Sequence, residues 1–131
     1  MRLFVDTSGW YSFLVARESM HQAIRTLLLE KDHKLITSNA IFSELFTLLV
    51  ARNHEAVGIT FGERLRQGDE CTVYRVSEVD EEKAWEILKE RRGRGLSYTD
   101  ATTIALMARL DVRDLVTLDR GFKEFDLNIL P

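Results

Sequence analysis

The segment Leu3-Phe4-Val5-Asp6-Thr7-Ser8-Gly9 joins a short apolar run to a polar turn. Its three apolar residues are typical of a buried strand, and the polar residues after them favour a turn or the start of a helix. The same order of elements recurs twice, at Lys34–Ser38 and at Leu115–Asp119. Repeated strand-to-helix units of this kind are typical of a parallel sheet covered by helices on both faces.

The rest of the chain extends this pattern. Further strands are predicted at 71–76 and 128–130, beside those at 3–5, 34–37 and 115–118. Helices are predicted from Ser8 onward, at 19–31, after an N-cap at Ser38, at 55–67, at 80–92 and after Ser97. We therefore expect an α/β fold: a three-layer α/β/α arrangement around a short, mainly parallel sheet, with residues 1–131 as a single domain.

Composition limits the classes of protein that remain. The formal net charge of -3 argues against a protein that simply coats nucleic acid. No signal peptide and no membrane span is predicted, and the single cysteine, Cys71, is expected to be a core thiol in a reducing cytoplasm. His21, His33 and His54 show no paired spacing, so they are interpreted as surface residues and a zinc site is not expected.

Four acidic residues lie in otherwise apolar surroundings. Asp6 is the only charged residue between Leu3 and Ala16, Glu44 the only one from 40 to 51, and Asp100 the only one from 95 to 108; Asp119 directly follows an apolar strand. A carboxylate in such a place is costly unless it is paired or binds a cation. Asp6 and Asp119 follow strands, and Asp100 and Glu44 lie near helix starts, so all four can meet at one edge of the sheet.

Each acid also has an ordinary interpretation. Asp6 can cap the helix that follows it, Asp100 can be the second member of a capping pair with Ser97, and Asp119 can be a turn residue before Gly121. Glu44 has the weakest such interpretation, because its helix neighbours are apolar. Together, four like charges need a counter-charge, and Mg²⁺ or Mn²⁺ is the natural partner for oxygen ligands.

Four segments in this order resemble the PIN domain, and more narrowly the VapC-type toxins of prokaryotic toxin–antitoxin pairs: 4–8, 43–45, 96–101 and 116–122. The resemblance implies a ribonuclease that cuts RNA with Mg²⁺ or Mn²⁺. It implies Asp6 and Asp100 as main metal ligands, with Asp119 and Glu44 completing the site directly or through water. It also implies supporting polar side chains at three positions: Thr7, Ser8 and Thr117.

Candidate contacts to RNA lie beside these segments. Arg94 and Arg120 are predicted to contact phosphates, although basic residues near a helix end can also simply favour the helix dipole. Tyr98 and Trp10 could stack on unpaired bases, with core or interface packing as the alternative that we favour for Trp10.

Protein partners are predicted from an apolar helix face that the rest of the chain is not expected to cover. The helix at 41–50 is apolar nearly all round, because Phe42, Phe46 and Val50 extend beyond its main stripe. We expect this face to remain uncovered and to serve a homodimer and a small antitoxin, unless neighbouring helices cover it. The VapC resemblance implies both partners.

Two other classes of protein remain open. A receiver-like domain would also bind Mg²⁺ in an acidic pocket, but it usually needs a lysine where the 115–118 strand ends in Asp119. A catalytically silent interaction module is the second alternative, and the presence of all four acids gives it no support.

Overall fold

A computed structural model describes residues 1–131 and has a five-stranded, wholly parallel sheet in the order β3-β2-β1-β4-β5. The strands are β1 (Arg2–Val5), β2 (Lys34–Ser38), β3 (Cys71–Tyr74), β4 (Asp114–Val116) and β5 (Asn128–Leu130). In the centre, Phe4 of β1 pairs with Ile36 of β2 and Leu115 of β4. The carboxyl ends of β1 and β4 therefore lie side by side, as expected for Asp6 and Asp119.

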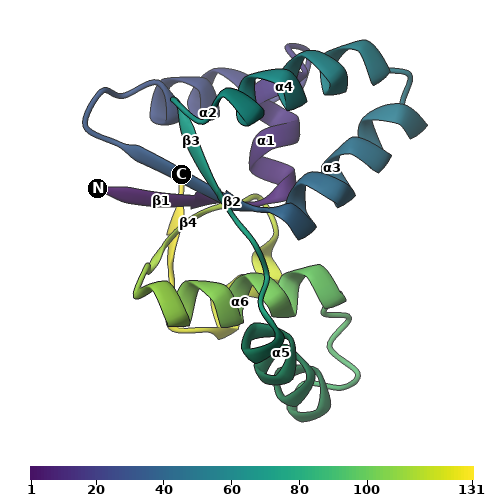
Figure 1. Cartoon of the computed structure of the whole chain (residues 1–131), viewed down its shortest axis with the longest axis vertical. Coiled ribbons are helices and arrows are strands. Elements are labelled where there is room, and N and C mark those ends of the chain that lie inside the picture. The colour runs from purple at the N-terminus through teal and green to yellow at the C-terminus, as the bar shows by residue number, and fades with distance from the viewer.

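Helices cover both faces of the sheet, so the three-layer α/β/α prediction is confirmed (Figure 1). One face carries α1 (Thr7–Leu14), α2 (His21–Leu28), α3 (Asn39–Ala51) and α4 (Glu55–Gln67), and the other carries α5 (Glu78–Glu90) and α6 (Tyr98–Leu110). No helix has the length and apolar character that crossing a membrane requires.

The expected elements are all present, with shifted ends. The predicted strand at 71–76 stops at Tyr74, and the strand at 115–118 lies at 114–116, because strand pairing ends before the polar turn begins. The helix expected at 19–31 covers only His21–Leu28. A short 3-10 helix, η1 (Arg120–Glu124), was not predicted; Asp119 caps it by accepting a hydrogen bond from the Gly121 backbone N–H.

The expectation of an uncovered apolar face on α3 is largely wrong. The ring of Phe46 packs against Gly58 of α4 and the ring of Phe42 against Gly62, so closely that an added Cβ would lie 3.0 Å from either ring. Glycines at these two positions let α4 approach α3, and both phenylalanines become partly buried. Val50 remains exposed at the end of the helix.

The prediction that the three histidines are surface residues is wrong, and the prediction that the cysteine is a core thiol is confirmed. His21, His33 and His54 are half-buried rather than on the surface, and His21 and His33 contact the backbone carbonyls of Ser12 and Leu27. Cys71 is a buried thiol, as expected, and burial raises its pKa to about 12.

Candidate functional site

Asp6 lies at the carboxyl end of β1 and is only 3% exposed. It occupies the N-cap position of α1, but its side chain makes no capping hydrogen bond, so the ordinary interpretation fails here. The Thr117 hydroxyl donates to Asp6 Oδ2 at 2.9 Å, while Oδ1 is buried without any hydrogen-bond partner. A buried carboxylate oxygen with no partner is rare in folded proteins and calls for an explanation such as a bound ion.

The surroundings of Asp6 disfavour its charged form. Burial raises the pKa of Asp6 from 3.8 to about 6, against the hydrogen bonds from Thr117 and the Thr7 backbone, which lower it. The charges of Asp100 and Glu44 raise the pKa further, so these two carboxylates lie near Asp6. The fold thus brings the acids of β1, α3 and α6 together.

Asp100 has two roles at once. Its Oδ2 accepts from the Ser97 backbone N–H at 3.1 Å, and the Ser97 hydroxyl accepts from the Asp100 N–H, which completes the predicted capping box of α6. Burial nevertheless raises the pKa of Asp100, and the charges of Asp119 and Glu44 add to this rise. The capping interpretation is correct but incomplete, because a cap alone does not require acidic neighbours.

A hydroxyl network supports the acids. The Thr7 hydroxyl donates to Glu44 Oε1 at 2.6 Å. Thr117 donates to Asp6 and accepts from the backbone N–H of Asp119 at 3.0 Å, while Ser8 lies 3.1 Å from Thr117. These three hydroxyls, from α1 and the residue after β4, tie the two strand ends together and orient Asp6 and Glu44.

The donor set fits a hard divalent cation. All candidate ligands are carboxylate oxygens, and Asp6 Oδ1 lacks any other partner. No group of three or more acidic, histidine or cysteine side chains is arranged as a metal cage, so the fit rests on the chemistry of the donors and on the unpartnered Asp6 oxygen. Asp119, at the rim, is exposed and holds the Gly121 N–H with Oδ1, while its Oδ2 accepts no hydrogen bond.

The residues predicted to contact RNA differ in their exposure and in the partners they already have. Arg120 and Tyr98 are exposed, and the Tyr98 hydroxyl donates to Glu81 at 3.3 Å. Arg94 is exposed but paired with Glu124, a residue that the sequence did not single out because no local pattern links it to the acids. Trp10 is buried in the core and donates its indole N–H to Thr37, which excludes base stacking.

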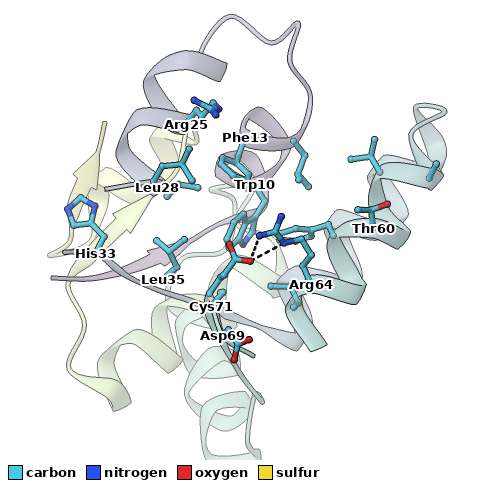
Figure 2. Close-up of a pocket in the computed structure, with 17 residues that line it drawn as sticks. Trp10, Phe13, Arg25, Leu28, His33, Leu35, Thr60, Arg64, Asp69 and Cys71 are labelled. Carbon is cyan, nitrogen blue, oxygen red and sulfur yellow. Dashed lines mark hydrogen bonds and ion pairs between the residues drawn. The ribbon is translucent and has the colours of Figure 1, made fainter. Parts of the chain in front are cut away.

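Away from the four acids, a groove of about 830 Å³ lies among α1, α2, α4 and the β2–β3 edge (Figure 2). Trp10 and Phe13 of α1, Leu28 of α2 and Leu35 of β2 form much of its wall, and the Arg64–Glu70 ion pair lies at its side. None of the four acids lines it, so the groove is separate from the carboxylate site.

Known proteins carry the same fold. A family model described as PIN domain matches residues 3–128. The 23S rRNA-specific endonuclease VapC20 of Mycobacterium tuberculosis is 34% identical over 124 residues, 92% of this chain and 91% of that protein. The crystal structure of that VapC20, described as a sarcin–ricin loop cleaving toxin, matches with a TM-score of 0.86 and 28% identity over 96% of this chain and 98% of that one.

A more distant structure, VapBC2 from Rickettsia felis bound to a DNA fragment, shares the fold with a TM-score of 0.72 at 15% identity, over 98% of this chain and 97% of that one. The order of the four acids, the parallel sheet and these matches agree with one another. The chain therefore belongs to the PIN domain family and, within it, to the VapC endonucleases.

Proposed function

We propose that residues 1–131 form a single PIN nuclease domain, a metal-dependent endoribonuclease that acts in the cytoplasm as the toxin of a toxin–antitoxin pair. The observation that carries the proposal is the buried Asp6 carboxylate, with one oxygen unpartnered and with Asp100 and Glu44 close enough to raise its pKa. PIN nucleases in general use a divalent metal ion. We propose Mg²⁺ or Mn²⁺ here, because every candidate ligand is a carboxylate oxygen.

The proposed roles follow from the positions of the side chains. Asp6 and Asp100 bind the ion, and Glu44 and Asp119 complete the site directly or through water. A bound divalent ion lowers the pKa of a water molecule and neutralises charge at the phosphate that is cut. Thr117 and Ser8 hold Asp6 in orientation, and Thr7 holds Glu44. The receiver-like alternative is not retained, since β4 leads to Asp119 rather than to a lysine.

We propose 23S rRNA as the substrate, because the VapC20 protein that is 34% identical to this chain carries that specificity. Arg94, Arg120 and Tyr98 are the proposed RNA contacts near the acids. Such side chains bind backbone phosphates or stack on unpaired bases without needing a long duplex.

Incubation of the purified protein with ribosomes tests this function. We expect a single break in 23S rRNA with Mg²⁺ or Mn²⁺, mapped by primer extension, and no break in EDTA. The Asp6→Asn and Asp100→Asn variants should be inactive, and Glu44→Gln should be less active. Undiminished cleavage in EDTA would contradict the proposed metal dependence. Intact rRNA under all conditions would contradict 23S rRNA as the substrate.

We propose two protein partners as well: a second copy of the chain, whose presence light scattering would reveal as a dimer mass, and a small antitoxin. Because α4 covers Phe42 and Phe46, the α3 face is no longer the best antitoxin surface. The groove beside Trp10 and Phe13 is more suitable, since eleven of its seventeen lining residues are hydrophobic. An amphipathic antitoxin helix would bury its apolar side there.

A further inference from the structure

A second, small pocket of about 60 Å³ adjoins the carboxylate site. Asp100 and Asp119 form one side of it, so whatever occupies this pocket is in contact with two of the four acids. The remaining lining comes from the α5–α6 connection and from η1, and its charged members are Arg91, Arg94 and Glu124. Positive charge thus lies directly beside the cluster of acids.

The two arginines are held in place by the chain around them. Gly93 and Gly95 have φ angles of 87° and 74°, a left-handed conformation that glycine adopts without strain, and they turn the connection sharply. The Arg94 N–H donates to the Arg91 carbonyl at 3.1 Å within this turn. The Arg91 guanidinium also lies over the Phe125 ring, 4.4 Å from its centre, which limits the conformations of that side chain.

Glu124 lies between the two guanidinium groups. Arg94 Nη1 donates to Glu124 Oε1, and Arg91 Nη1 lies 3.9 Å from Oε2. A carboxylate held in this way occupies the position in which a phosphate oxygen would be bound by two arginines. The three side chains are between one-third and two-thirds exposed, so the pairing is screened by water and contributes little stability.

We propose that Arg91 and Arg94 form a subsite for an RNA backbone phosphate next to the carboxylate site, and that Glu124 is its counter-ion in the free protein. The incoming phosphate displaces Glu124 and takes over both guanidinium groups. This proposal rests on the proposed function, in which RNA is the substrate. To that function it adds the path of the RNA strand, which runs from the acids toward the α5–α6 connection. It also adds two residues that act on the RNA backbone, Arg91 and Glu124.

A purely structural role for Glu124 predicts the opposite behaviour. If Glu124 only ties η1 to the α5–α6 connection, its loss should loosen the arginines and weaken RNA binding. If Glu124 competes with phosphate, the Glu124→Gln variant should bind RNA more tightly. The sign of the change in affinity therefore separates the two roles.

Binding of a fluorescent sarcin–ricin stem–loop RNA in EDTA tests the proposal without cleavage. We expect Glu124→Gln to bind up to about fivefold more tightly than wild type, because a competing exposed ion pair contributes up to about 1 kcal/mol. Arg94→Ala should bind more weakly, and the slope of its affinity with salt should fall by roughly 0.7, as for one lost phosphate contact. Arg91→Lys keeps the charge but not the planar group, and should weaken binding less than Arg91→Ala.

The Arg113–Asp126 pair is a matched control, since it joins an arginine and a carboxylate near η1 but does not line the pocket. Asp126→Asn should leave RNA affinity close to that of wild type. Equal gains in RNA affinity for Asp126→Asn and Glu124→Gln would mean that only the overall charge matters, and would overturn the proposed subsite. Weaker or unchanged RNA binding by Glu124→Gln would overturn it as well. If wild type neither binds this RNA in EDTA nor cuts rRNA with metal, the proposed function itself has failed.

Discussion

At the scale of single residues, Asp6 carries most of the chemical information. It is buried, one of its oxygens has no partner, and its pKa is raised to about 6, first by burial and then by Asp100 and Glu44. A group whose folded pKa lies above its unfolded value of 3.8 destabilises the fold once it ionises. The metal-free protein therefore keeps an unfavourable charge that a bound cation would neutralise.

The Asp6→Asn variant should be more stable than wild type in EDTA at pH 8. Raising the pKa of Asp6 from 3.8 to about 6 destabilises the folded wild type by roughly 3 kcal/mol once Asp6 is ionised. This destabilisation is absent below about pH 4, grows between about pH 4 and about pH 6, and is complete above that range. Thermal melts in EDTA at pH 4 and pH 8 should show the two proteins converging at the lower pH. A variant that melts below wild type at pH 8 would mark Asp6 as a structural residue.

At the scale of elements, α5 and α6 begin with the same motif. Ser77 with Asp80, and Ser97 with Asp100, each form a complete capping box. Arg109 of α6 donates to both carboxylate oxygens of Asp80, at 2.8 and 2.9 Å, and lowers its pKa. Asp100 has no such partner and lies among acids. One box therefore fastens the two helices together, while the other presents a carboxylate to the site.

Asp80→Asn should destabilise the protein by about 2 kcal/mol, because it weakens charged hydrogen bonds to Arg109 at a buried position. Since the folded pKa of Asp80 is depressed, this contribution is present above pH 3.8 and disappears as pH falls through the folded pKa. Urea titrations at pH 7 measure the loss. The matched change Asp100→Asn, at the same capping position, should cost no stability in EDTA; similar losses in both would mean that capping, rather than the Arg109 pair, accounts for the effect.

At the scale of the whole molecule, the carboxylate site and the apolar groove are lined by different residues. The groove walls come from α1, α2 and α4, and the acids from the ends of β1 and β4 and the starts of α3 and α6. An antitoxin in the groove would therefore bind the protein through residues that take no part in cutting RNA. Binding and catalysis should be separable by mutation.

Leu29→Glu tests this separation, because Leu29 lines the groove and is 51% exposed, so the change should not disturb folding. The variant should still cut rRNA but should no longer co-purify with a co-expressed antitoxin. Trp85→Glu, an equally exposed hydrophobic position on α5 outside the groove, serves as the control. Retained co-purification by Leu29→Glu, or its loss in both variants, would exclude the groove as the antitoxin surface.

Local sequence determined the elements of this protein and the identity of its acids. Hydrophobic runs, the Ser38 cap and the Ser97–Asp100 box act over a few residues, so strands, helices and the four isolated carboxylates could be predicted from neighbours in the chain. Element ends shifted by a few residues, because pairing and packing decide where a strand or helix stops.

Tertiary structure alone decided which acids are neutralised and which surfaces remain open. Asp80 and Asp100 occupy the same position of a capping box, yet Arg109 lies 29 residues from the first, and Glu44 lies 56 residues from the second. The cover over Phe46 likewise depends on Gly58 of the next helix. Coulombic and packing energies depend on distance in space, which local patterns do not specify, so the charge of a site and the coverage of a face appear only when the chain is folded.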